Sequence, residues 1–410
     1  MADRVLLLMP TATYKATDFL AAAEKLGVEV IVGSDRRQAL EDEAPGRTLA
    51  LDFLEPQRSV TRITQLGDAG ALRAVVGTDD ETTLLAAAAA AALGLPHNPL
   101  EAVRAARDKH ETRRLLAAAG LPGPTFARVA LDAEPAAAAA GAPYPCVLKP
   151  LGLSASRGVL RADDAAQFVA AFARIRAILA QPDVRGKGGD AQHLLVEEYI
   201  PGAEVALEGL LARGELRVLA LFDKPDPLEG PTFEETLYVT PSRRPDATQA
   251  AIAAEVQAGC RALGLREGPV HAELRLPGGL PWLLELAPRT IGGLCSRTLR
   301  FGAGVSLEEL ILRHALGRGT GELVRERSAS GVMMIPVPRA GRLRAVDGLE
   351  AARAVPGVEG VTITIPLGGE VVPLPEGHRY LGFIFARDAS PAAVEAALRQ
   401  AHARLRFELD

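Results

Sequence analysis

The sequence contains few cysteines, few aromatic residues and no long apolar run. Three cysteines occur among 410 residues, at Cys146, Cys260 and Cys295, without Cys-x-x-Cys spacing. This sparse set argues against a disulfide framework or a zinc site and fits a reducing compartment. The longest apolar run, residues 84–95, is shorter than the ~20 residues that cross a bilayer, and no signal-peptide cleavage site follows the N-terminal apolar run. We therefore expect a cytoplasmic protein with no membrane partner.

The chain also lacks an excess of either charge. It has 46 basic and 51 acidic residues, a net charge of −5, so no basic field is available for a nucleic-acid partner. With 48% hydrophobic and 24% charged residues, the composition is that of an ordinary globular protein. At roughly 150 residues per domain, the length predicts two or three domains.

The first hundred residues alternate short apolar runs with helical patterns. Strands are expected at 5–8, 28–33, 48–51 and 73–77, and continuous apolar strands between helices are typical of a parallel sheet covered on both faces. This pattern predicts a Rossmann-like unit. The Gly-x-Gly-x-x-Gly fingerprint of dinucleotide enzymes is missing after the first strand, which argues against a dehydrogenase.

The remainder is more varied. The pattern is helical over 99–120, two hairpins are expected over 204–222 and 271–287, and a polar, proline-rich loop is expected over 223–245. From about residue 328 strands and helices alternate again, which predicts a small lobe.

Two lysines are candidates for phosphate binding. Lys149 ends a strand directly before a loop of small residues, 152–158, and Lys109 lies in the helical segment before it. A flexible ammonium beside loop N–H groups suits phosphate oxygens. The plain alternative is two surface lysines and a turn.

Two glutamates are candidates for metal binding. Glu273 and Glu285 lie on the two strands of a predicted hairpin, where cross-strand neighbours can share one face. Paired carboxylates with phosphate oxygens are typical Mg²⁺ ligands, although two solvated charges would give the same pattern. Arg289, beside Gly292 and Gly293, could clamp a carboxylate or an acyl phosphate, or form an ordinary surface salt bridge.

Together these segments resemble the ATP-grasp superfamily. The segment Asp108-Lys109-x-x-x-Arg113 is similar to its first lysine motif, and Val-Leu-Lys149-Pro to its second. Within the superfamily, the stretch Glu285-Leu-Ala-Pro-Arg289-x-x-Gly-Gly resembles the L-amino acid (dipeptide) ligase type.

The resemblance implies an α/β (α+β grasp) architecture in three parts. A Rossmann-like pre-ATP-grasp domain would cover 1–98, a two-lobed ATP-grasp domain 99–318, and a small C-terminal α/β lobe 319–410. It further implies an ATP-dependent ligase that joins a small carboxylate, such as an amino acid, to an amine through an acyl phosphate. The cofactors implied are ATP and Mg²⁺, with Mn²⁺ as a substitute. We expect a homodimer from chain size alone.

The resemblance also implies roles for individual residues. The residues expected to bind ATP are Lys109, Lys149, Ser154, Ser156, Glu197, Tyr199, Ile200 and Glu204. The metal ligands would be Glu273 and Glu285, with Ala287 where the superfamily often has Asn. The catalytic residues would be Arg289 and Lys149. The substrate contacts would be Glu234, Glu235, His271, Arg289, Gly292 and Gly293.

Three of these assignments stay open at this point. Glu234 and Glu235 could instead belong to a solvated loop, and His271 could be a packed core histidine. A bicarbonate-dependent or purine-pathway ATP-grasp ligase is the nearest alternative function, although residues 295–302 lack the biotin carboxylase motif. A non-catalytic nucleotide-binding module is the alternative from another class.

Overall fold

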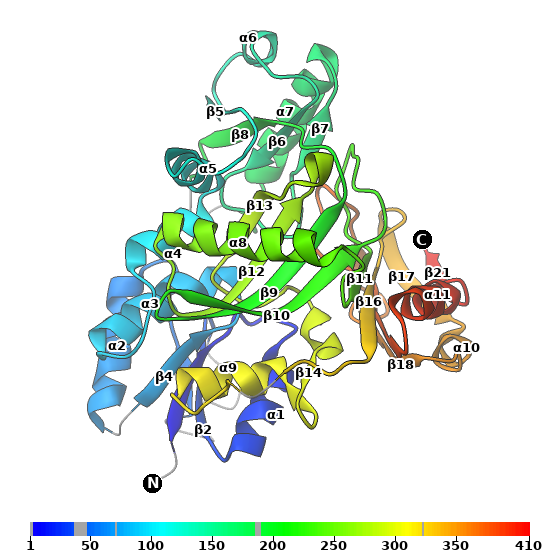
Figure 1. The fold of residues 1–410 in the computed structure, drawn as a ribbon. Helices are drawn as coiled ribbons and strands as arrows, with labels where there is room; N and C mark the ends of the chain where they lie inside the picture. Colours follow the sequence, from blue (N-terminus) through cyan, green and yellow to red (C-terminus); the bar gives the residue numbers. More distant parts are fainter. Residues whose placement is uncertain (1–2, 37–46, 70–71, 185–189, 322–323) are drawn as a thin grey trace.

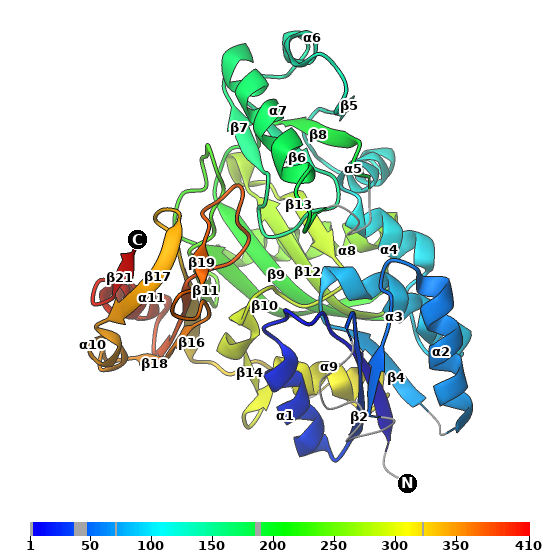
Figure 2. The ribbon, with the colours of Figure 1, turned by 180° about the vertical axis from the view of Figure 1, so that it is seen from behind.

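A computed structural model describes residues 3–36, 47–69, 72–184, 190–321 and 324–410. The described residues form three units. In Figure 1 the N-terminal unit lies at the bottom, a small unit with β5–β8 at the top, and a large central sheet between the two. Figure 2 shows the same arrangement from behind, with the C-terminal elements to one side of the central sheet.

The N-terminal unit has the parallel sheet that the sequence predicts. Its strands β1 (Arg4–Leu8), β2 (Glu29–Ser34), β3 (Thr48–Ala50) and β4 (Leu72–Gly77) pair in the order β3-β2-β1-β4, all in parallel. Successive β1 side chains point to opposite faces, so Val5 and Leu7 pack into one core and Leu6 and Leu8 into another. The helices of this unit are α1 (Ala16–Leu26), α2 (Pro56–Ala69) and α3 (Asp80–Ala92).

One face of this sheet is covered partly by a helix from another part of the chain. Helix α9 (Leu307–Ala315), far along the chain, packs with α1 on the same face, whereas α2 and α3 cover the other. The N-terminal unit is therefore anchored to the rest of the protein through a shared core.

The helical segment predicted over 99–120 is in fact two helices. These are α4 (Leu100–Arg107) and α5 (Lys109–Ala118), and Asp108 between them has extended dihedral angles. Its carboxylate accepts the N–H groups of His110 and Glu111 at 2.9 and 3.0 Å. Asp108 therefore caps α5, which places Lys109 in the first turn of a helix and not in its middle.

The small unit is an antiparallel sheet backed by a helix. Its strands pair in the order β5-β8-β6-β7, and α7 packs on β6 and β7. The elements are β5 (Phe126–Ala130), α6 (Pro135–Ala140), β6 (Cys146–Pro150), β7 (Leu160–Ala162), α7 (Ala165–Leu179) and β8 (His193–Glu198).

The central sheet has eight strands in the order β13-β12-β9-β10-β11-β16-β20-β18. It includes both predicted hairpins, with β9 paired to β10 and β12 paired to β13. The strands are β9 (Glu204–Ala212), β10 (Glu215–Lys224), β11 (Leu237–Thr240), β12 (Gly268–Arg275), β13 (Trp282–Ala287), β16 (Ala329–Ile335), β18 (Val358–Ile363) and β20 (Gly382–Asp388). The loop expected over 223–245 is shorter than predicted, because β10 extends to Lys224 and β11 lies within it.

The same sheet continues into the C-terminal part of the chain, because β11 pairs with β16 over four residues. The division at residue 318 remains a prediction, and the hydrogen-bonded sheet crosses it. The remaining elements are α8 (Asp246–Leu263), η1 (Pro277–Gly279), η2 (Cys295–Thr298), β14 (Arg300–Phe301), β15 (Val305–Ser306), β17 (Gly341–Asp347), α10 (Leu349–Arg353), β19 (Glu370–Val371), α11 (Pro391–His402) and β21 (Arg406–Leu409). In the described part of the chain, no helix has both the length and the apolar character needed to span a bilayer.

Candidate active site

A pocket lies between the small unit and the central sheet. Its wall from the small unit includes Lys149 on β6 and Ser154 and Ser156 in the loop after it, and α5 contributes Lys109. The central sheet contributes glutamates from β9, β12 and β13. The predicted residues that line this pocket are Lys109, Lys149, Ser154, Ser156, Glu197, Tyr199, Ile200, Glu204, Glu235, Glu273 and Glu285. The structure therefore gathers eleven predicted residues from six elements and three loops around one space.

Lys149 is held in a buried triad. The carboxylate of Glu197 contacts the Lys149 ammonium and lies 2.7 Å from Nε of Arg113. All three residues are below 10% exposure. Burial opposes ionisation of Glu197, but the two cations outweigh it and lower its pKa from 4.5 to about 2. Glu197 thus stays charged and orients Lys149, a link that the sequence motif did not reveal.

A second cluster surrounds Lys224, which the sequence analysis missed. Its ammonium lies 2.7 Å from Glu204 and 3.4 Å from Glu273, and it also contacts Glu235. Oxygens of these three carboxylates lie within 4.8 Å of one another, a spacing compatible with a metal ion. Because the buried ammonium already contacts each of them, the cluster holds an internal cation in that position.

The hairpin of β12 and β13 brings the two predicted metal ligands together. Glu273 and Glu285 are directly paired in the strand register, and cross-strand partners have Cβ atoms about 5 Å apart. Burial opposes ionisation of Glu273, but Lys224 and His271 outweigh it and hold its pKa well below the usual range. Ala287 at the end of β13 offers no side-chain oxygen.

A second pocket adjoins the first and reaches the N-terminal unit. Five residues line both, namely Ser154, Ser156, Glu235, Glu273 and Glu285. The predicted residues found only in the second pocket are His271, Arg289, Gly292 and Gly293. Glu234 lines neither, since its carboxylate accepts the Val337 N–H at 3.0 Å. The two pockets share a wall at the Glu273–Glu285 pair.

His271 is buried between two carboxylates. Its Nδ1 lies 3.2 Å from Glu208, and its Nε2 lies 3.4 Å from Glu273. Burial disfavours the charged ring, but the two hydrogen-bonded glutamates raise its pKa from 6.5 to about 9. The imidazolium is thus the stable form at neutral pH, which makes His271 a donor and not a base.

The loop over 152–158 closes one side of both pockets. Ala155 and Ser156 have φ values of 55° and 54°, a left-handed conformation that costs energy for residues other than glycine. The N–H of Gly158 donates to Pro375 O at 2.9 Å, so this loop touches the C-terminal part of the chain. The loop therefore bridges parts that are distant in sequence.

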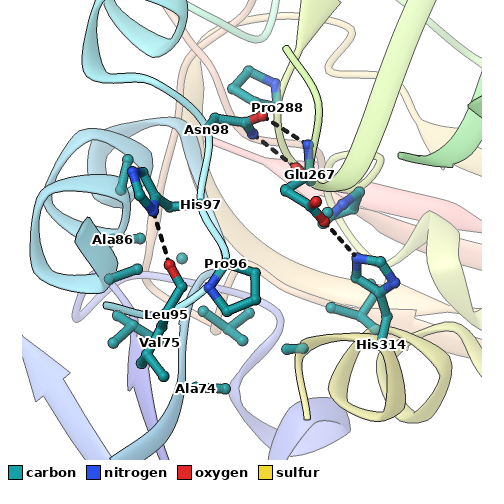
Figure 3. A pocket seen from close by; sticks show the side chains of 18 of the residues that line it. Ala74, Val75, Ala86, Leu95, Pro96, His97, Asn98, Glu267, Pro288 and His314 are labelled. Atoms are coloured by element: carbon teal, nitrogen blue, oxygen red, sulfur yellow. Dashed lines mark hydrogen bonds and ion pairs between the residues drawn. The ribbon is translucent and has the colours of Figure 1, made fainter. Parts of the chain in front are cut away.

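A third cavity lies apart from these residues. Figure 3 shows its mixed wall of alanines, prolines and valine, with Glu267 linked to both Asn98 and His314. No predicted site residue lines it. Pro288, which precedes Arg289 in the chain, forms part of its wall.

Comparison with known proteins agrees with this geometry. Residues 142–298 match the ATP-grasp domain, residues 20–97 the ATP-grasp N-terminal domain, and residues 333–410 the L-amino acid ligase C-terminal domain 2. The chain belongs to the ATP-grasp superfamily, whose members use ATP.

Solved structures and curated relatives define the group more narrowly. An L-amino acid ligase from Bacillus licheniformis is 27% identical, with a TM-score of 0.84 over 100% of this chain and 99% of that one. A D-alanine–D-alanine ligase of Aromatoleum aromaticum is 35% identical over 44% of this chain, and carnosine synthase 1 of Gallus gallus is 33% identical over 50%. The matches span 55% and 23% of those two proteins. The chain is thus an ATP-grasp carboxylate–amine ligase that is similar to the L-amino acid ligases.

Proposed function

We propose that the protein activates an amino acid carboxylate with ATP and joins it to an amine, with release of ADP and phosphate. The observation that carries this proposal is the shared wall at Glu273 and Glu285. A triphosphate in the first pocket and a carboxylate in the second would meet there. Lys149, Lys109 and the loop over 152–158 border the same point.

The nucleotide would lie with its base at the end of β8. Two backbone groups of the segment after β8 already form hydrogen bonds. The Tyr199 N–H donates to Pro145 O at 2.8 Å, and Ile200 O accepts from Arg275 at 2.8 Å. The Tyr199 carbonyl and the Ile200 N–H enter no hydrogen bond with the described residues, and adenine needs one acceptor and one donor of this kind. Glu204, fixed by Lys224 and Arg275, would face the ribose.

Glu273 belongs both to the Lys224 cluster and to the Glu273–Glu285 pair, and Glu285 makes the pair the better magnesium site. Glu285 is 30% exposed, and its nearest cation is Arg289 at 3.6 Å, so its oxygens remain accessible. Bound there, Mg²⁺ or Mn²⁺ would offset charge on the transferring phosphoryl group. Ala287 supplies no third side chain, which leaves that position to water or to bidentate Glu285.

The reaction itself would need few protein groups. The substrate carboxylate attacks the γ-phosphorus, ADP leaves, and an acyl phosphate forms. Arg289 and the amides at Gly292 and Gly293 would hold this intermediate and the charge that develops when the amine attacks. Both ring nitrogens of His271 face carboxylates, so its contribution would be to hold Glu273 in place. Closure of the loop over 152–158 would exclude water from the acyl phosphate.

The second pocket favours an amino acid with an apolar side chain. Its acidic residues outnumber its cations, which suits a substrate ammonium, and Glu235 is the better placed of the two predicted glutamates. One part of its wall consists of Tyr14, Cys295, Met334 and Tyr380. Such a surface gains more from burying an apolar side chain than a polar one.

The test is ADP release across amino acids, alone and in pairs. We expect release to require Mg²⁺ and a carboxylate and amine pair, with apolar amino acids preferred. Glu285→Ala should abolish turnover without unfolding the protein, whereas Glu101→Ala on α4 should not change it. No stimulated release with any pair, or full activity of Glu285→Ala, would contradict the proposal.

Two further properties belong to the proposal. We infer a homodimer from chain size, which light scattering of the purified protein would test. We also infer a cytoplasmic location, with support from three cysteines that are free and buried. Localisation of a fluorescent fusion would check that location.

A further inference from the structure

The N-terminal unit places charged side chains directly at the segment after β13 that carries Arg289. Asp80 is the first residue of α3, and its Oδ1 lies 2.8 Å from Nε of Arg289. Lys15, at the start of α1, is 2% exposed and donates to Thr78 O at 2.8 Å and to Thr290 Oγ1 at 3.0 Å. Both residues line the second pocket. Neither belongs to a motif that the sequence analysis identified.

Arg289 is held on two sides and faces Glu285 on the third. Its Nε pairs with Asp80, its Nη1 donates to Thr290 O at 2.9 Å, and its Nη2 is 3.6 Å from Glu285. Glu285 is the nearest competing anion. If Asp80 lost its charge, the guanidinium would be drawn toward Glu285, and the carboxylate that we assign to the metal would be neutralised by an arginine.

Asp80 is itself fixed in place. It occupies the N-terminus of α3, where the helix dipole favours a carboxylate, and its carbonyl accepts the Thr83 hydroxyl at 2.9 Å. Arg289 is only 8% exposed, so its buried charge needs a nearby carboxylate, and Asp80 is the nearest one. The pair joins two units of the fold at the point where the acyl phosphate would form.

We propose that Asp80 is the positioning residue for Arg289, and that the N-terminal unit thereby sets the geometry of the group that holds the acyl phosphate. Lys15 supports the same loop through Thr290. The inference rests on the proposed function for the role of Arg289, but the contact between Asp80 and Arg289 can be tested separately.

A matched control exists in a second ion pair between the same two parts of the chain. Asp18 on α1 pairs with Nε of Arg297 at 2.9 Å, and neither residue lines the second pocket. Asp80→Asn and Asp18→Asn each remove one aspartate charge from an aspartate–arginine Nε pair. Only Asp80→Asn changes the pair at the site.

We expect Asp80→Asn to lower kcat at least tenfold with KM for ATP within twofold of wild type, and Asp80→Glu to recover part of the loss. Asp18→Asn should stay within twofold of wild type in kcat. Equal kcat values for the two asparagine variants would overturn the inference. Full activity of Arg289→Ala would also overturn it, because Arg289 would then have no role to support.

An NMR measurement tests the contact without turnover. In arginine-labelled protein, the Arg289 Nε–H proton should exchange slowly with solvent in wild type and in Asp18→Asn, and quickly in Asp80→Asn. Unchanged exchange in Asp80→Asn would overturn the inference. Absence of any ADP release by wild type would contradict the proposed function, and this exchange measurement would still decide whether Asp80 fixes Arg289.

Discussion

Neutralising the buried Glu197 should lower the free energy of unfolding more than neutralising an exposed glutamate beside the same pocket. Glu197→Gln keeps the shape of the side chain but leaves Arg113 and Lys149 buried beside a neutral amide. Breaking a buried ion pair in this way costs about 3–5 kcal/mol. The lowered pKa gives a similar figure, because the difference between 4.5 and about 2 corresponds to about 3 kcal/mol at neutral pH.

A single tryptophan can report on the unfolding of this region. Trp282 is the single tryptophan, and Arg113 donates to the carbonyls of the next two residues, Leu283 and Leu284, at 2.6 and 3.2 Å. Urea unfolding followed by Trp282 fluorescence therefore reports on the strand that the triad contacts. We expect Glu197→Gln to lose about 3 kcal/mol in this transition.

Glu198 provides the control, because it is adjacent, exposed and outside the triad. Glu198→Gln should change stability by about 0.5 kcal/mol or less. Adding Arg113→Met to Glu197→Gln should recover part of the loss, since one stranded cation is removed. Equal stabilities of Glu197→Gln and Glu198→Gln would refute the reasoning.

The same triad predicts a pH dependence. The pKa of Glu197 is lower in the folded protein than in the unfolded chain, so its contribution to stability is complete above about pH 4.5 and is lost as the pH falls toward 2. Wild type should therefore lose stability more steeply than Glu197→Gln between pH 5 and pH 3. Parallel profiles of the two proteins would count against a charged, paired Glu197.

Three further predictions concern the second pocket, the thiols and the small unit. Gly293 has φ of 58°, and an added Cβ would lie 2.8 Å from the Phe383 ring. Gly293→Ala should therefore lower the free energy of unfolding by about 1–3 kcal/mol and lower kcat/KM. Gly292→Ala is the control, because an added Cβ there meets open space and should leave stability unchanged. Burial raises the pKa of all three cysteine thiols, so a thiol reagent at pH 8 should label none in native protein and three after unfolding. Arg174 pairs with Glu376, with Nη2 2.9 Å from Oε2, and this contact joins α7 to the C-terminal part. Because the pair is partly exposed, Arg174→Gln should raise KM for ATP by no more than about fivefold. A larger change would mean that the contact controls closure of the small unit over the nucleotide.

The sequence was most informative where chemistry depends on local spacing. The hairpin predicted over 271–287 placed Glu273 opposite Glu285 in register, because a short turn with alternating strands leaves little freedom in pairing. Lys149 could be proposed as a phosphate ligand for a similar reason, since a strand end followed by small residues is a local pattern.

The residues that were missed act through contacts between distant segments. Lys224 ends a strand in a charged segment without a recognisable motif. It became recognisable only when β9, β12 and the segment before β11 brought carboxylates around it. Asp80 was hidden in the same way, since its partner is 209 positions further along the chain. A charge that faces a buried partner has the same local sequence as one that faces water, so only the tertiary structure separates the two cases.

The central sheet links the parts of the chain before and after residue 318. Strand β16 follows that point in sequence but pairs with β11 before it, and the register joins Leu237 to Met333. The two cores on either side of this pairing share the strands, with Tyr238 and Val332 in one and Val239 and Met333 in the other. Removing the C-terminal part would therefore expose the edge of β11 and its side chains Leu237 and Val239, which pack in the C-terminal core. Strand β11 begins two residues after Glu235, which lines both pockets. The C-terminal part is in this sense a structural component of the active site, and a truncation at 318 should lose the site together with the sheet.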